Sequence, residues 1–183
     1  LAKKAYDSGM SFDQLKQLVV SSGLTSGFGG QVLGDTTSLK SYANSFGVSN
    51  YLNDKYWSQK QRDLFLGNTT TNDIEAEIRG LAASAFPGYA NQINAGVTVD
   101  SIASAYKGSM AAILERDADS ITYEDPRLRA ALQYTSPDGK PAVKPLWQFE
   151  RELRSTPEWE TTNNARNTID SLSYKALNDL GLI

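Results

Sequence analysis

The sequence TVDSIASAYKGSMAAILE, residues 98–115, has the most regular helical pattern in the chain. Apolar side chains recur every three or four residues, which places them on one helix face: Val99, Ile102, Tyr106, Met110, Ile113 and Leu114. Alanine and glycine occupy several positions between them, and small side chains let a neighbouring helix approach closely. We therefore expect residues 98–115 to form the central helix of the fold.

Three helical segments are predicted nearer the C-terminus. Residues 146–153 have one apolar face, and Thr156-Pro157 is a helix-start signal for a short turn that carries Trp159. We expect Trp159 to be buried against the central helix. The last helix is expected to start at Thr161 or Thr162, to stop at Gly181, and to pack against other helices through an apolar stripe: Ala165, Ile169, Leu172, Ala176, Leu177 and Leu180.

Capping residues and glycine stops predict further helices upstream of the central one. They cover residues 35–46, 49–66 and 70–86, with Asn72 and Glu75 as the capping pair of the third, and a short helix follows through Ile93. The aromatic residues of 49–66, Trp57 among them, are expected in the core, because large rings bury much apolar area. Asp125-Pro126 predicts one more short helix, residues 127–133.

The N-terminal part differs in composition from the rest. Residues 2–8 resemble the end of a helix, and Ser11 and Gln14 have the capping-box spacing for another. Residues 21–34 contain five glycines and are expected to be a flexible linker. We thus expect a helical arm and linker at 1–34 and a helical domain at 35–183. The chain begins with Leu1, and we expect it to be a piece of a longer polypeptide.

The expected fold class is all-α, a compact multi-helix domain with an N-terminal helical arm. The only turn with possible extended flanks is Pro-Asp-Gly at residues 137–139, so residues 135–144 could form at most one small β-ribbon.

The amino-acid composition excludes several classes of catalytic and binding site. The chain of 183 residues has no cysteine and no histidine, which excludes disulfides, thiolate nucleophiles and every histidine-based site. The net charge is −3, with 8 basic and 8 acidic residues up to Ala95 and 10 and 13 after it, so no basic platform for nucleic acid is visible. No apolar run is long enough for stable membrane insertion. We predict that the chain is not an enzyme, with no catalytic, cofactor-binding or metal-binding residue.

Three candidate motifs are unlike functional sites, two because of their spacing and one because of its neighbouring charges. The glycine-rich stretch lacks the Gly-Lys-Ser/Thr of a phosphate-binding loop. Asp117-x-Asp119 would start a calcium loop, but Thr122 and Leu128 stand where that loop needs glycine and glutamate. Four nearby glutamates could include a glycosidase pair, although three arginines in the same region would keep them ionised. The glutamates are Glu150, Glu152, Glu158 and Glu160, and the arginines are Arg151, Arg154 and Arg166.

The C-terminal part resembles a segment of virion proteins of tailed bacteriophages that infect actinobacteria. The resemblance lies in the motifs Phe149-Glu150, Leu153-Arg154, Thr156-Pro157-Glu158-Trp159, Thr162-Asn163-Asn164-Ala165 and Leu177-Asn178-Asp179-Leu180-Gly181-Leu182. Thr156 replaces the aspartate of the family pattern, a swap between two capping residues. Residues 96–103, Tyr106, Met110-Ala111 and Asp125-Pro126 also resemble the preceding segment, so the similarity covers most of the chain from about Leu39.

The resemblance implies a structural module of a tape-measure-like protein in the phage tail, involved in tail assembly and genome delivery. It also implies a homo-oligomer that binds other virion proteins, such as those of the tail hub or tail tube. Two alternatives stay open within the virion: an internal ejection protein of the head, and a cell-wall-binding accessory of a lytic enzyme with Trp57 and Trp159 holding glycan. A host-encoded helical interaction domain is a further alternative.

Overall fold

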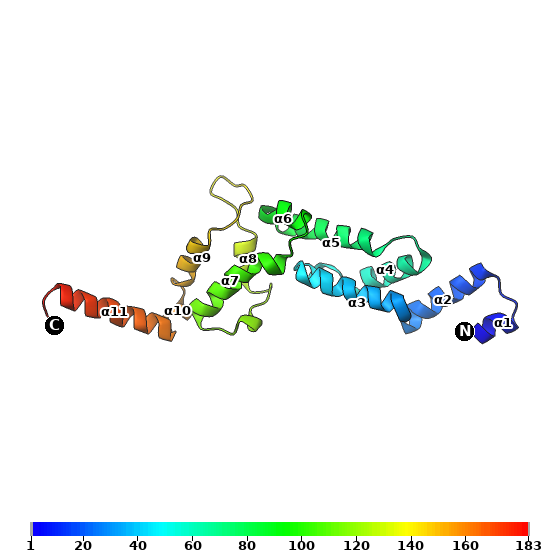
Figure 1. Ribbon diagram of the computed structural model, residues 1–183, viewed down its shortest axis with the longest axis horizontal. Helices are drawn as coiled ribbons and strands as arrows, with labels where there is room; N and C mark the ends of the chain where they lie inside the picture. The colour runs from blue at the N-terminus through cyan, green and yellow to red at the C-terminus, as the bar shows by residue number, and fades with distance from the viewer. Residues whose placement is uncertain (1, 183) are drawn as a thin grey trace. The chain divides into compact units, whose positions relative to one another are not determined.

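The computed structural model describes residues 2–182, and Figure 1 shows helices joined by turns and loops of different lengths. No β-strand occurs among these residues, which confirms the predicted all-α class. Within residues 135–144, where at most a small β-ribbon was expected, the structure has one antiparallel bridge between Thr135 and Pro141. Contacts divide the chain into two compact units, one ending at Ser84 and the other beginning at Ala85, and each is described separately below.

Unit 1 is built from helices that are joined by short turns. Its elements are α1 (Ala2–Asp7), α2 (Phe12–Ser26), α3 (Gly30–Ser45), the 3-10 turn η1 (Ser49–Tyr51), α4 (Asp54–Leu66) and α5 (Thr71–Ala85). Ser11 and Gln14 form the predicted capping box at the start of α2, with the Gln14 amide 3.3 Å from the Ser11 hydroxyl.

The predicted flexible linker at 21–34 is wrong, because only residues 27–29 separate α2 from α3. Packing explains why this glycine-rich stretch is ordered. Gly23 lies inside α2 directly against the ring of Phe28, where a Cβ atom would be 2.6 Å from the ring. Phe28 is buried and its ring centroid lies 5.8 Å from that of Phe65 in α4. The boundary expected after Gly34 therefore falls inside α3.

The core of unit 1 lies between α3, α4 and α5. Its buried apolar residues include Leu39, Ala43, Phe46, Val48, Trp57, Ile74, Ile78 and Ala82. A hydrogen bond of 2.6 Å from the Arg79 guanidinium to the Tyr42 hydroxyl also joins α5 to α3. Of the aromatic residues of 49–66 that were expected in the core, Trp57 is buried and Tyr56 and Phe65 are half-buried, whereas Tyr51 is 60% exposed and the prediction is wrong for it.

Three helix starts in unit 1 differ from prediction, and the first is that of α3, which begins at Gly30 and not at residue 35. Asn53 caps α4 four residues after the expected cap Ser49, and a short 3-10 turn precedes the helix. Thr70 and Asp73 form the capping pair of α5 in place of Asn72 and Glu75: the Thr70 amide donates to the Asp73 carboxylate, and the Asp73 amide donates to the Thr70 hydroxyl. Several Asx and Thr residues with cap spacing compete here, and only backbone geometry selects the pair.

Unit 2 is arranged around α7 (Val99–Leu114), the predicted central helix (Figure 1). Its other elements are η2 (Pro87–Tyr89), α6 (Ala90–Asn94), η3 (Ala118–Ser120), α8 (Pro126–Leu132), α9 (Leu146–Leu153), α10 (Pro157–Glu160) and α11 (Asn163–Asp179). α8 and α9 both pack against α7. The expected caps Asp125 and Thr156 accept a backbone N–H in the first turn of their helices, as do Thr162, one of the two starts expected for α11, and Thr98.

The apolar stripe of α7 faces the core of unit 2. Five of its six predicted members are buried, and Ile102 is half-buried. Tyr106 links this helix to three other segments: its ring meets that of Phe149 edge-on at 5.2 Å, and its hydroxyl lies 2.7 Å from that of Tyr89 and donates to the Lys144 carbonyl at 2.6 Å.

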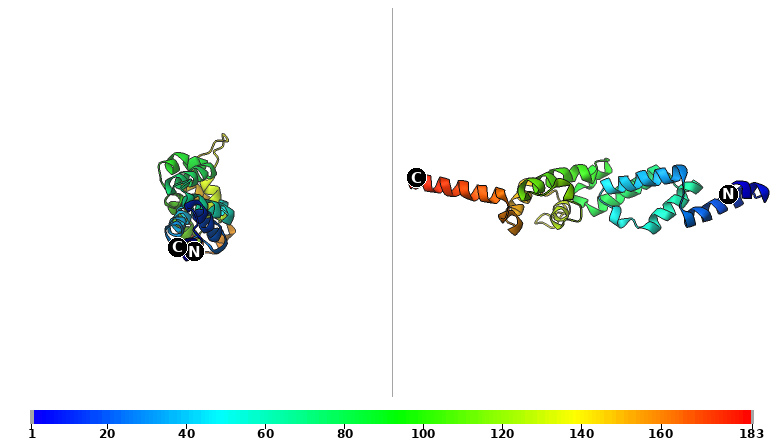
Figure 2. Two further views of the ribbon diagram at one scale, coloured as in Figure 1. Left: turned by 90° about the vertical axis from the view of Figure 1, so that its right-hand side faces the viewer. Right: turned by 90° about the horizontal axis from the view of Figure 1, so that it is seen from below.

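Two expectations for the C-terminal helices are wrong. Trp159 is half-buried, because the one-turn helix α10 contacts α7 without covering the whole indole ring. The stripe of α11 is exposed beyond its first turn, and only Ala165 of the helix is buried. Figures 1 and 2 show α11 leading away from α10 with no other helix of unit 2 beside it.

The contact between Tyr106 and Phe149 gives a stability prediction. Phe149→Ala should lower the free energy of unfolding of unit 2 by about 3–5 kcal/mol, because it removes a buried ring and leaves a cavity. Trp147→Ala is the matched control in the same helix: Trp147 is 63% exposed, so the change should be less than about 1 kcal/mol. Urea denaturation measures both, and equal losses in the two variants would contradict the assigned burial.

Candidate interaction surface

The glutamates that could have formed a catalytic pair are engaged in ion pairs and hydrogen bonds. Glu150 accepts a hydrogen bond from the Ser109 hydroxyl at 2.8 Å and lies 3.7 Å from the Arg154 guanidinium. Glu158 pairs with Arg127. A cationic partner favours the ionised carboxylate, whereas a general acid must carry a proton.

The other two glutamates do not complete such a pair. Glu152 is paired with the ammonium group of Lys144, and Glu160 is exposed. No cluster of three acidic side chains that could hold a metal ion occurs among residues 2–182. The geometry thus brings Glu150, Glu152 and Glu158 to basic partners and does not assemble them into one site.

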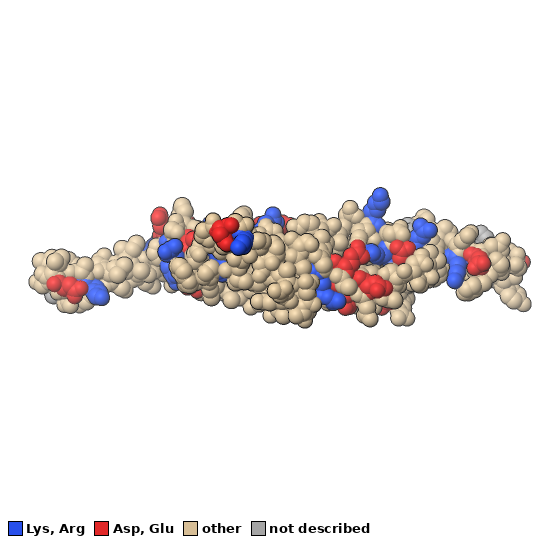
Figure 3. All heavy atoms as spheres, turned by 90° about the horizontal axis from the view of Figure 1, so that it is seen from above, with Lys and Arg blue, Asp and Glu red and all other residues tan. Residues whose placement is uncertain are grey.

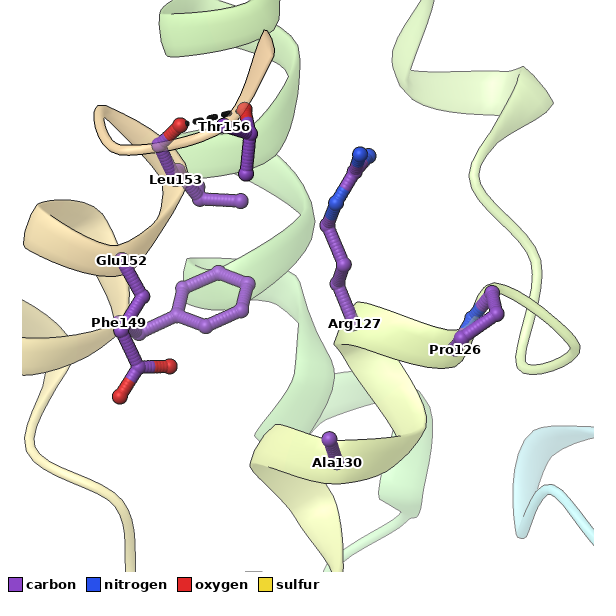
Figure 4. A pocket seen from close by; sticks show the side chains of 7 residues that line it. All are labelled: Pro126, Arg127, Ala130, Phe149, Glu152, Leu153 and Thr156. Atoms are coloured by element: carbon purple, nitrogen blue, oxygen red, sulfur yellow. Dashed lines mark hydrogen bonds between the residues drawn. The ribbon is translucent and has the colours of Figure 1, made fainter. Parts of the chain in front are cut away.

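A small pocket lies between α8 and α9 (Figure 4). Its volume is about 240 Å³, and its lining residues are Pro126, Arg127, Ala130, Phe149, Glu152, Leu153 and Thr156. Ligand sites usually have roughly 300–1,000 Å³ and several polar groups that converge on the ligand. Here the Thr156 hydroxyl donates to the Leu153 carbonyl, and Arg127 and Glu152 form ion pairs with residues that do not line the pocket. The pocket is a packing gap between two helices.

The tryptophans differ in how much of their rings is accessible to a ligand. Trp57 is only 6% exposed, and the Lys40 ammonium lies 5.7 Å from its ring centroid, so it presents no open face for a sugar. Trp147 is the exposed one, with the Arg151 guanidinium 5.3 Å from its ring centroid. Sequence reasoning missed Trp147. The available signal was its position two residues before Phe149, which puts the two rings on different sides of a helix.

Charges give no guide to an acidic or basic partner. Figure 3 shows Lys and Arg side chains interspersed with Asp and Glu on the face that it displays. No helix among residues 2–182 has both the length and the apolar character needed to cross a membrane. The surface feature considered next is apolar and lies on α11.

The first turn of α11 is held by Glu115, the residue that directly follows α7. One carboxylate oxygen accepts the Asn163 amide at 3.1 Å and the other accepts the Asn164 amide at 2.8 Å. The Asn163 side-chain amide donates to the same carboxylate, and that of Asn164 donates to the Ala112 carbonyl at 2.7 Å. A carboxylate at this position also interacts favourably with the positive end of the helix dipole.

Beyond Ala165, every described residue of α11 and its C-terminal end is exposed. The apolar members of the predicted stripe are therefore in solvent: Ile169 is 56% exposed, Leu172 62%, Leu177 40% and Leu180 72%. Large apolar side chains gathered on one exposed face mark interaction sites on soluble proteins. A helix of 17 residues rich in Asn, Ser and Thr is also only marginally stable without a covering partner. This stripe is the candidate interaction surface.

Glu115 predicts a pH dependence for the attachment of α11. Hydrogen bonds from the Asn163 and Asn164 amides, together with Arg166, hold the pKa of Glu115 below its ordinary value of 4.5. A lowered pKa in the folded state means that the contact stabilises fully above pH 4.5 and is lost as the pH falls through the lower folded value.

In an NMR titration, the amide resonances of Asn163 and Asn164 should therefore shift with a midpoint below pH 4.5. Glu115→Gln should remove this transition, while Glu160→Gln, at an exposed position in α10, should leave it in place. A midpoint at or above the ordinary glutamate value in the unmodified chain would contradict the prediction.

Comparisons of the chain with protein-family models, with curated proteins and with solved structures found no match.

Proposed function

We propose that this chain is a structural module of a tailed-phage virion, part of a tape-measure-like protein that takes part in tail assembly and genome delivery. The observation that carries the proposal is the exposed apolar stripe of α11, which needs a protein partner. The phage assignment itself rests on the resemblance of residues 149–182 to virion proteins of actinobacteriophages. In the proposed assembly, copies of the chain associate with one another and with tail hub or tail tube proteins.

The motif residues of that resemblance have structural roles in unit 2, which supports a structural rather than a catalytic function. Thr156 accepts the Trp159 amide and starts α10, and Thr162 accepts the Ala165 amide and starts α11. At the other end of α11, the Leu182 amide donates to the Leu177 carbonyl at 2.9 Å, after Gly181 has taken a φ of 68°. The motifs set the bounds of two helices and hold the corner between them.

The proposal predicts that the stripe of α11 is needed for incorporation into particles. Leu172→Asp should reduce the amount of the protein in purified virions at least about tenfold, because a charge on the stripe must lose its hydration when a partner covers it. The adjacent Ser171→Asp is the matched control: it adds the same charge to an exposed site of α11 off the stripe and should have no effect.

Quantitative mass spectrometry of particles carrying each variant measures this incorporation. Cryo-microscopy of the virion then distinguishes the tail from the head, and density in the head alone would replace the tail assignment with that of an internal ejection protein. Absence of the protein from purified particles would refute the virion assignment altogether and favour a host-encoded interaction domain.

The second candidate, a cell-wall-binding accessory, is favoured by one observation, the exposed ring of Trp147. On the structural proposal, the purified chain should neither cleave nor bind peptidoglycan. Release of soluble fragments that stops in Glu150→Gln or Glu158→Gln would show catalysis. Sedimentation with peptidoglycan that is lost in Trp147→Ala but kept in Trp57→Phe would instead establish the accessory role.

A further inference from the structure

Glu115 occupies an unusual backbone position for its residue type. It follows the last residue of α7 with φ 52° and ψ 40°, and among residues 2–182 no other non-glycine residue has a positive φ. Glycine is the common residue at such a helix end, because a Cβ atom disfavours the left-handed conformation. A glutamate here works against the local backbone preference, and the contacts of its side chain account for its presence.

These contacts, together with the buried Ala165, hold the first turn of α11 against the end of α7. Both carboxylate oxygens of Glu115 accept amides from the first turn of α11, and Asn164 adds one bond to the Ala112 carbonyl. Arg166, on the next turn, adds an attractive charge. No apolar residue of α11 after Ala165 is buried, so packing does not contribute further along the helix.

The start of α11 does not depend on Glu115. The Thr162 hydroxyl accepts the Ala165 amide at 3.1 Å and donates to the Trp159 carbonyl at 2.6 Å. Thr162 is buried and belongs to the corner between α10 and α11. The Thr162 cap that begins α11 is thus separate from the contact with Glu115 that sets the direction of the helix.

We propose that Glu115 is a releasable latch, which holds α11 against the end of α7 and whose opening lets α11 pivot at residues 161–162 as an intact helix. When the contact between Glu115 and α11 is broken, the apolar stripe of α11 faces a different direction, and the core of unit 2 stays folded. The proposal concerns this chain alone and does not depend on the virion assignment.

The test uses spin labels on the whole chain, which has no cysteine of its own. Labels at Ala105→Cys, exposed on α7, and Ser173→Cys, exposed on α11, report the distance between the two helices. The parent chain should give one narrow distance distribution. Glu115→Gly should broaden it about two-fold or more, as expected when a hinge replaces a fixed contact. Glu115→Gln, with one acceptor oxygen in place of two, should give an intermediate width.

Two further measurements separate a latch from a residue that only supports the fold. Glu115→Gly should leave the helical circular dichroism unchanged and should not lower the melting temperature of unit 2, because glycine suits the backbone at this position. Glu160→Gln should keep the narrow distribution. A parent distribution that is already broad, an unchanged width in Glu115→Gly, or a loss of helix in that variant would each overturn the proposal.

Discussion

The buried hydroxyl of Tyr106 is the contact on which unit 2 depends most. It lies 2.7 Å from the hydroxyl of Tyr89 and donates to the carbonyl of Lys144, while the ring packs edge-on against Phe149. One side chain of α7 thereby joins η2, the loop before α9 and α9 itself. Burial and the hydrogen bond with Tyr106 raise the pKa of Tyr89, so the Tyr89 hydroxyl stays neutral. A buried polar chain of this kind is stabilising only when every member has a partner.

The same region shows how polar groups are accommodated beside the core. Lys144 is 7% exposed, with its ammonium group paired to Glu152 and 5.3 Å from the centroid of the Tyr134 ring. A buried cation without such partners would be strongly unfavourable. The glutamates that suggested catalysis in the sequence thus have a structural explanation, since Glu152 neutralises Lys144 and Glu150 joins α9 to Ser109 of α7.

α11 is held in place by a different kind of contact from the other helices of unit 2. Apolar burial fixes α7, α8 and α9, whereas polar contacts at a single turn fix α11. Charge-assisted hydrogen bonds at an exposed site exchange readily with water, and a buried apolar interface does not. The unit therefore combines a packed apolar core with a helix whose apolar face is exposed.

The sequence by itself determined the all-α class, the position of α7 as the central helix, the bounds of α9 and the caps of α8 and α10, because these depend on local periodicity and on short-range capping bonds. It narrowed the cap of α11 to Thr161 or Thr162, and the structure has Thr162. Tertiary structure alone decided the rest. Residues 21–34 have the composition of a linker, but they are largely helical, with Phe28 packed on Gly23. The apolar stripe of α11 is exposed, although a stripe with similar spacing in α7 is buried. Periodicity shows which side chains share a helix face, but only the arrangement of the other helices determines whether that face is covered.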